Sequence, residues 1–163
     1  MEKLEITGGK KLQGSINISG SKNASLPILA ASILANKIIL TNIPSVRDID
    51  TMVELLISLG SIIEINKNKK TIKINNHKTR KTIAKYKLVK TMRAGILVLG
   101  SLLSRFNKAK VSLPGGCAIG LRPVNIHIDA LKKMGVKFKI VDGYIYAIVK
   151  NSLKGAKIKF KKI

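Results

Sequence analysis

The sequence of 163 residues has one cysteine, two histidines, no tryptophan and only eight acidic residues. A single cysteine excludes an internal disulfide framework, and so few possible ligands offer no credible structural zinc site, so we expect a reducing compartment and neither metal nor cofactor. The start of the chain lacks the apolar core of a signal peptide, and the longest near-apolar stretches are well short of the ~20 residues that span a bilayer. These absences predict a cytoplasmic protein with no membrane partner.

The charge of the chain is strongly one-sided, because 31 basic residues against eight acidic ones give a formal net charge of +23 at pH 7. Such a charge favours anionic partners, namely nucleic acid, phosphorylated metabolites or acidic membranes. Lysine far outnumbers arginine, however, as expected when an AT-rich genome biases codon choice. Aromatic residues make up only 4%, so the basic and aromatic surface of single-strand binders is not expected, and we regard a nucleic-acid partner as the weaker hypothesis.

An internal repeat organises the chain. Each copy reads as an apolar helix, a short strand, a proline turn, an amphipathic helix that ends at a glycine, and a β-hairpin. The copies occupy roughly residues 22–80 and 81–150, and a third begins at 153–160. The expected elements are a strand at 15–18, apolar helices at 29–35 and 97–103, strands after 37 and after 110, hairpins of 62–65 with 71–74 and of 136–141 with 144–149, and an exposed strand at 157–162. The pattern predicts a mixed α/β (α+β) fold.

The second copy carries a glycine-rich insertion, residues 115–120, which holds the only cysteine, Cys117. Loops carry sites whereas repeated elements carry packing, so this insertion is a candidate site. Cations at Lys22, Arg93 or Arg122 would favour the thiolate needed for nucleophilic attack, whereas a protonated thiol could act as a general acid. The alternative is that Cys117 is a small buried hydrophobic residue.

A candidate anion site lies at the predicted helix start that follows Ser19-Gly20-Ser21, where Lys22 and Asn23 stand. Free N–H groups and the helix dipole favour negative charge at such a position. The repeat places Arg93 in the related position of the second copy, so two cationic copies of one slot suggest a shared anion site. The alternative is ordinary solvated charge at helix starts, and for His127 we favour a structural or capping role over catalysis.

Three segments carry a family resemblance: Ile18–Pro27, Leu88–Ala94 and, above all, Leu113–Val124. They closely resemble the UDP-N-acetylglucosamine 1-carboxyvinyltransferase family, the enolpyruvyl transferases that open peptidoglycan synthesis and so serve cell-wall biogenesis, cell shape and cell division. The resemblance is collinear over the chain and covers the N-terminal portion of a family member. It implies an inside-out α/β barrel of repeated βαβαββ units, here two units and the start of a third. Residues 1–21 would be opening strands that belong to the other domain, and 22–163 a partial first domain.

The resemblance also implies a reaction and its residues. The enolpyruvyl group of phosphoenolpyruvate is transferred to the 3-hydroxyl of UDP-N-acetylglucosamine, without a cofactor. Cys117 and Lys22 are the implied catalytic residues, with Cys117 giving a proton to the methylene carbon. The implied substrate-binding residues are Lys22, Asn23, Arg93, Arg122, Pro123, Val124, Asn125, Ile126 and Lys162. Asn125 stands where the family usually has Asp, so an amide replaces a carboxylate there.

Three hypotheses about the whole chain follow. It is a fragment or one half of a split enzyme that a second chain completes, because the Asp that the family uses as base for the sugar hydroxyl lies in the portion not present. Alternatively it is a non-catalytic remnant that at most binds nucleotide sugar or anions. The third hypothesis, based on charge alone, is a nucleic-acid-binding module.

Overall fold

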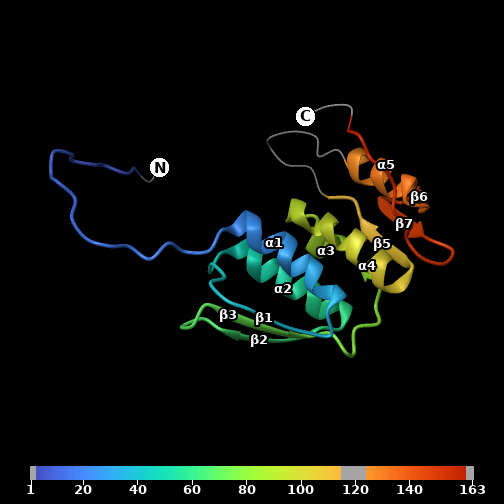
Figure 1. The fold of residues 1–163 in the computed structure, drawn as a ribbon, viewed down its shortest axis with the longest axis horizontal. Helices are drawn as coiled ribbons and strands as arrows, with labels where there is room; N and C mark the ends of the chain where they lie inside the picture. Colours follow the sequence, from blue (N-terminus) through green and yellow to red (C-terminus); the bar gives the residue numbers. More distant parts are fainter. Residues whose placement is uncertain (1–2, 115–123, 161–163) are drawn as a thin grey trace.

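The structure, a computed structural model, describes residues 3–114 and 124–160 and contains two small sheets with helices packed on them (Figure 1). Helices α1 and α2 lie over the first sheet, and α4 packs against β5 of the second. In chain order the elements are α1 (Lys22–Ala31), η1 (Ser32–Leu34), β1 (Lys37–Leu40), α2 (Arg47–Leu59), β2 (Ile62–Asn66), β3 (Thr71–Asn75), β4 (Ile83–Ala84), α3 (Tyr86–Val89), η2 (Arg93–Leu97), α4 (Val98–Phe106), β5 (Lys108–Ser112), α5 (Asn125–Lys133), β6 (Lys137–Val141) and β7 (Tyr144–Ile148), where η denotes a 3-10 helix. The mixed α/β class is therefore confirmed.

The two sheets share a strand order. The first runs β1-β3-β2 and the second β4-β5-β7-β6, so β5, β7 and β6 correspond to β1, β3 and β2. These pairings are antiparallel, whereas β4 adds to β5 in parallel. No strand within residues 3–114 and 124–160 takes the corresponding place beside β1. Both hairpins and the strands before them are confirmed.

Two predicted strands are wrong. Residues 15–18 form no strand, and Figure 1 shows this part of the chain as an extended leader running away from α1. Ile16 and Ile18 are 88% and 84% exposed, so no neighbouring strand pairs with their backbone groups, and an unpaired segment has no reason to hold strand geometry. Residues 157–160 of the expected strand at 157–162 likewise form neither helix nor strand, and residues 161 and 162 lie outside the described residues.

The helices follow from the hydrophobic pattern and their end signals. In α2 the buried side chains recur at helical spacing, and the helix ends at Gly60, whose φ of 105° is left-handed. A Cβ at Gly60 would also lie 3.2 Å from the carbonyl oxygen of Lys78, so the position favours glycine twice over. The apolar helix expected at 97–103 is present as η2 followed by α4, which ends at Asn107 with a φ of 59°.

One hydrophobic core unites both halves of the chain. Leu29, Ile33 and Leu56 from the first half and Leu99 and Leu102 from the second are at most 1% exposed and belong to the same cluster. Burial of such side chains is worth about 1.5–3 kcal/mol each, which makes this shared core the main force that joins the two sheets.

A polar junction reinforces that core. Asn76 is fully buried, and its Nδ2 donates to the carbonyl oxygens of Ser32 at 2.7 Å and Ala35 at 3.0 Å. Arg105 at the end of α4 reaches across to the same turn, donating to the carbonyl oxygens of Ile33, Ala35 and Asn76 and to the Asn36 side chain. The turn that follows α1 and η1 is therefore held from both halves.

Two further findings bear on function. No helix in the part of the chain that the structure describes is long and apolar enough to cross a membrane. Among the same residues, no three or more His, Cys, Asp or Glu side chains gather where they could hold a metal ion.

Candidate functional site

A cleft of about 530 Å³ opens where the start of α1 faces η2. Lys22 and Asn23 come from α1 and Arg93 from η2, so the structure brings together three residues that the sequence suggested as a shared anion site. Asp48 of α2, Thr91 and His127 of α5 also contribute polar side chains to the lining. Two cations and an amide in one concave site can bind a small anion such as a phosphate or carboxylate.

The start of α1 explains why Lys22 stands where it does. Ser21 caps the helix, accepting a hydrogen bond from the backbone N–H of Ala24 at 3.3 Å, so α1 begins at Lys22. The first turn carries no acidic residue and begins with Lys22. A cation at a helix N-terminus opposes the helix dipole, and this local cost would be offset by an anion bound there.

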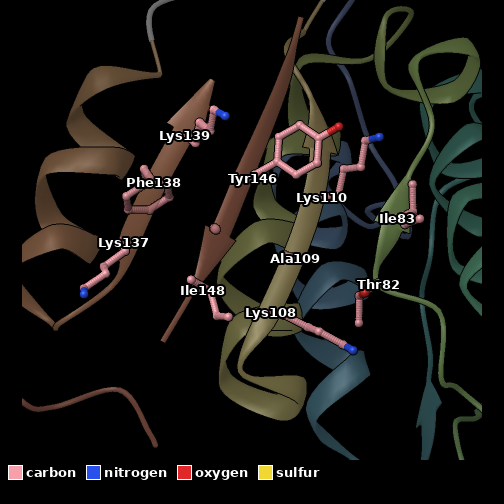
Figure 2. A pocket seen from close by; sticks show the side chains of 11 residues that line it. Thr82, Ile83, Lys108, Ala109, Lys110, Lys137, Phe138, Lys139, Tyr146 and Ile148 are labelled. Carbon is pink, nitrogen blue, oxygen red and sulfur yellow. The ribbon is translucent and has the colours of Figure 1, made fainter. Parts of the chain in front are cut away.

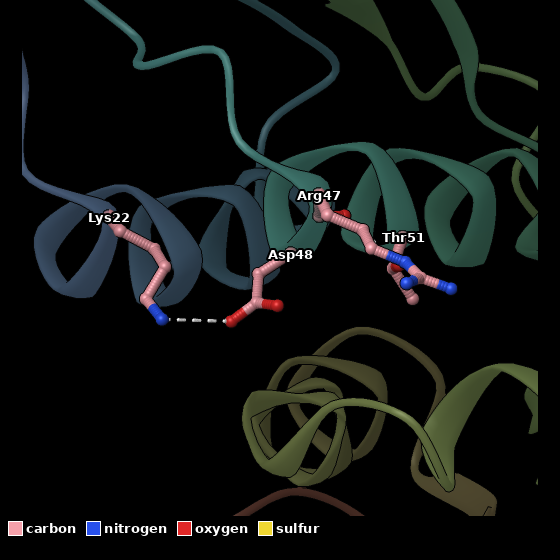
Figure 3. Close-up of polar contacts among 4 residues, drawn as sticks. All are labelled: Lys22, Arg47, Asp48 and Thr51. Carbon is pink, nitrogen blue, oxygen red and sulfur yellow. Dashed lines mark hydrogen bonds and ion pairs between the residues drawn. The ribbon is translucent and has the colours of Figure 1, made fainter. Parts of the chain in front are cut away.

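Asp48 already offsets part of that charge. Its Oδ2 lies 3.1 Å from Nζ of Lys22, and Figure 3 shows the two side chains bridging the starts of α1 and α2. Both side chains remain partly exposed, at 48% for Lys22 and 38% for Asp48, so the pair is worth no more than about 1 kcal/mol. An incoming anion can therefore compete for Lys22. Asp48 also lies in the first turn of α2, where the dipole of its own helix favours a negative charge.

The turn before α1 is fixed by a close backbone approach. The N–H of Gly20 donates to Oδ1 of Asn42 at 3.1 Å, and a Cβ at Gly20 would lie 1.7 Å from the carbonyl oxygen of Asn42. No side chain fits there without a backbone shift. Gly20 thus fixes the position from which Lys22 and Asn23 enter the cleft.

The other predicted site residues within the described ranges lie elsewhere. Val124 is half-buried against the core. Asn125 and Ile126 line a separate groove of about 510 Å³ between α5 and residues 158–160. Cys117, Arg122, Pro123 and Lys162 all lie outside the residues that the structure describes.

The family model for EPSP synthase (3-phosphoshikimate 1-carboxyvinyltransferase) matches residues 6–162, nearly the whole chain. The chain belongs to the EPSP synthase family. The match includes the residues that line the cleft at the start of α1.

Curated relatives of this EPSP synthase family member carry a more specific name. The chain is 65% identical over 164 residues to the UDP-N-acetylglucosamine 1-carboxyvinyltransferase of Pelagibacter ubique, and 54% identical over 165 residues to that of Sulfurovum sp.. In both cases the match covers 100% of this chain, but only 39% and 38% of the relative. The resemblance read from the sequence motifs is confirmed, and the chain spans well under half the length of these relatives.

Solved structures agree on the fold. The enolpyruvyl transferase NikO from Streptomyces tendae superposes with a TM-score of 0.73 at 20% identity, covering 90% of this chain and 32% of that one. EPSP synthase from Acinetobacter baumannii gives a TM-score of 0.61 at 18% identity, covering 87% of this chain and 33% of that one. At such identities the likeness establishes the fold alone.

Sequence reasoning missed one residue of the cleft and set another aside. No pattern in the sequence indicates that Asp48 pairs with Lys22, because the two residues stand on different helices 26 positions apart. His127 was favoured as a structural or capping residue, yet it is exposed and lines the cleft. Its position one turn into the helix after Val124 was the only available signal.

Proposed function

We propose that this chain provides the first part of an enolpyruvyl transferase that moves the enolpyruvyl group of phosphoenolpyruvate to the 3-hydroxyl of UDP-N-acetylglucosamine in peptidoglycan synthesis. The observation that carries the proposal is the cleft that gathers Lys22, Asn23 and Arg93. Phosphoenolpyruvate bears a phosphate and a carboxylate, so two separate cations in one cleft suit its two anionic ends. The names of the relatives support the choice of acceptor.

The proposed chemistry assigns each group a task. Cys117 gives a proton to the methylene carbon, which makes the carbon bonded to the phosphate oxygen electrophilic. The sugar 3-hydroxyl attacks that carbon and loses its proton to a base outside this chain. Loss of a proton from the new methyl group and departure of phosphate then restore the double bond. Lys22 stabilises the charge on phosphate as this bond breaks.

The sugar nucleotide is assigned to the other side of α5. Its proposed contacts are Arg122, Pro123, Val124, Asn125, Ile126 and Lys162. The groove lined by Asn125, Ile126, Lys159 and Phe160 supports this assignment, since it runs between the start of α5 and the segment that precedes Lys162. An amide at Asn125 can donate as well as accept a hydrogen bond, so it suits the mixed donors and acceptors of a uracil ring.

The fold proposal is that residues 22–80 and 81–150 are two βαβαββ units of an inside-out α/β barrel, and that a third unit begins after residue 150. The common strand order of the two sheets supports it. Residues 1–21 belong in this proposal to a second domain. That domain, with the rest of the first, comes either from a longer chain or from a separate partner chain, and the site of action is the cytoplasm.

A thiol-protection assay tests the site directly. Because Cys117 is the only cysteine, alkylation by a maleimide reports on it alone. We expect phosphoenolpyruvate with UDP-N-acetylglucosamine to slow alkylation at least about tenfold, and Lys22→Gln or Arg93→Gln to abolish the protection. The matched control is Lys37→Gln, since Lys37 is an exposed lysine on β1 outside the cleft. Unchanged alkylation in the presence of both substrates would remove the proposed site.

A non-catalytic remnant that binds nucleotide sugar or anions is the second candidate, because the cleft of Lys22, Asn23 and Arg93 suits anion binding without turnover equally well. Phosphate release separates the two. The remainder of a relative, supplied as a separate chain, should restore substrate-dependent phosphate release if this chain is half of an enzyme. Protection of Cys117 without any release in the mixture would identify a binding remnant.

A further inference from the structure

The second sheet carries a second basic surface, on strands rather than at a helix start. Alternate residues of its strands point to opposite faces, and Ala109, Val111 and Ile145 turn into the core. On the opposite face, two rows of residues form what we call the Lys-Tyr face, namely Lys108, Lys110, Lys137, Lys139, Tyr146 and Ile148. These residues line a groove of about 500 Å³ that shares no residue with the cleft at α1 (Figure 2).

Strand register sets the residues of this face in two rows. Tyr146 on β7 stands between Lys110 on β5 and Lys139 on β6, and in the next row Ile148 stands between Lys108 and Lys137. Successive lysines on one strand are about 7 Å apart, since each residue advances the chain by about 3.4 Å. The face therefore has a central apolar and aromatic strip with a line of ammonium groups along each side.

The side chain of Lys110 is positioned by contacts with two aromatic rings. Its Nζ lies 4.6 Å from the ring centre of Tyr144 and 4.7 Å from that of Tyr146. The hydroxyl of Tyr144 in turn accepts a hydrogen bond from the backbone N–H of Tyr86 at 3.2 Å. The contact between the Lys110 ammonium and Tyr146 raises the pKa of Lys110, with smaller contributions from the charges of Tyr144 and Asp142. The side chain is thus charged and ordered before any ligand arrives, which lowers the entropic cost of binding.

The first sheet offers an internal comparison at identical positions. Where the second sheet has Lys110, Tyr146 and Lys139 in one row, the first has Ile39, Lys73 and Glu64. Lys73 and Glu64 lie 3.8 Å apart as an ion pair, so that row is neutral. The repeat thus produces the same scaffold twice, but only one copy concentrates positive charge around an aromatic ring.

We propose that the Lys-Tyr face is a binding surface for single-stranded nucleic acid. Four ammonium groups complement a phosphate backbone, and the strip of Tyr146 and Ile148 offers a flat apolar floor on which a base can stack. An acidic protein segment would match the charge, but it would not use the central strip in this way. The sequence did not reveal this surface, because Lys110 and Tyr146 are 36 positions apart.

The test is equilibrium binding of a fluorescein-labelled oligo(U) of twelve nucleotides to the full chain, measured by anisotropy from 50 to 300 mM salt. Loss of two phosphate contacts in Lys110→Gln/Lys139→Gln should reduce the slope of log K against log salt by about 1.4. Since such curves converge near 1 M salt, this corresponds to about 25-fold weaker binding at 0.1 M. Tyr146→Leu should weaken binding at least about fivefold through lost stacking.

The matched control is Lys37→Gln/Lys73→Gln, which removes the same charge from the corresponding face of the first sheet. We expect it to change the affinity less than about threefold. Equal losses in both double variants would overturn the proposal, because net charge alone would then explain binding. So would poly-glutamate binding as tightly as oligo(U) with no effect of Tyr146→Leu, which would identify an acidic-protein surface.

A measurement on the unmodified chain covers the case in which a variant does not fold. Oligo(U) containing 4-thiouridine is photocrosslinked to the protein, and the modified peptides are identified by mass spectrometry. Crosslinks concentrated in residues 108–112 and 137–148 support the proposal. Crosslinks spread over the lysine-containing peptides in general, or concentrated at residues 22–48, overturn it.

Discussion

Removal of the Asn76 side chain is the sharpest test of the buried polar network that holds the turn after η1 in the first half of the chain. In Asn76→Ala four side-chain hydrogen bonds disappear. Two are donated by Nδ2 to the carbonyl oxygens of Ser32 and Ala35, and two are accepted by Oδ1 from the hydroxyls of Ser61 at 2.6 Å and Thr79 at 3.3 Å. Every one of them is lost from a side chain that is 0% exposed.

The expected cost follows from the count and from what each partner retains. A net contribution of about 1 kcal/mol for each bond gives about 4 kcal/mol. The partners are not left wholly unsatisfied, since Ser61 and Thr79 lie 3.4 Å apart and Arg105 also donates to Ala35. We therefore expect the free energy of unfolding to fall by about 3–5 kcal/mol, which lowers Tm by about 6–20 °C.

Urea denaturation followed by circular dichroism measures this change, with Asn75→Ala as the matched control. Asn75 precedes Asn76 in the chain, but its side chain accepts only an exposed hydrogen bond from the backbone N–H of His77, at 3.1 Å, so its loss should cost about 1 kcal/mol or less. Similar costs in the two alanine variants would refute the reasoning.

A second variant at the same position adds a pH signature. Asn76→Asp keeps the shape of the side chain but turns an oxygen toward two carbonyl oxygens, so burial should raise the pKa of the introduced carboxyl in the folded state. The folded state then binds more protons than the unfolded state, and the free energy of unfolding should rise as the pH falls from 7 toward 4. If the loss in the free energy of unfolding does not change with pH, the introduced carboxyl is hydrated and the reasoning is wrong.

The remaining predictions concern single positions. Gly20→Ala forces a methyl group onto a backbone carbonyl, so it should lower the free energy of unfolding by about 1–3 kcal/mol and also remove the protection of the thiol by substrates. Gly100→Ala has open space around the new methyl, so thermal denaturation should show a free energy of unfolding higher by up to about 1 kcal/mol. Arg105→Lys keeps the charge but loses the fork that holds several oxygens, so Tm should fall by a few degrees, and an unchanged Tm would contradict that role. Tyr146→Phe removes the main contact that raises the pKa of Lys110, so the pKa measured by NMR should fall toward its ordinary value. Because that pKa is raised on folding, the stabilisation by Lys110 is present at neutral pH and is lost as the pH rises through it.

Local patterns in the sequence were sufficient for the hairpins. Residues 62–65 are rich in isoleucine, residues 71–74 alternate polar and apolar side chains, and Gly60 follows an amphipathic run. The signals for the strands and for the helix end therefore lie within a few residues. The leader shows the limit of this reasoning. Residues 15–18 have a strand pattern, but a strand forms only against a neighbour, and the pattern does not say whether one is present.

The candidate site was predictable only where the repeat related its parts. Lys22 and Arg93 occupy equivalent slots, which is why a shared anion site could be suggested before the structure placed both in one cleft. Their role in binding substrate stays a prediction. Asn76 and Asp48 carry no comparable signal, since the importance of each depends on partners from other elements that no local pattern connects to them.

Within residues 3–114 and 124–160, β1 is an edge strand, and this has a practical consequence for handling the protein. Ile39 on that strand is 63% exposed, and the strand's outer backbone groups are left for water, whereas β4 shields the corresponding rim of β5. Unpaired edge strands of this kind can pair with strands of other molecules, and such association increases with protein concentration. Dilute solutions should therefore limit self-association, and short peptides that pair with the outer edge of β1 should act as caps against it.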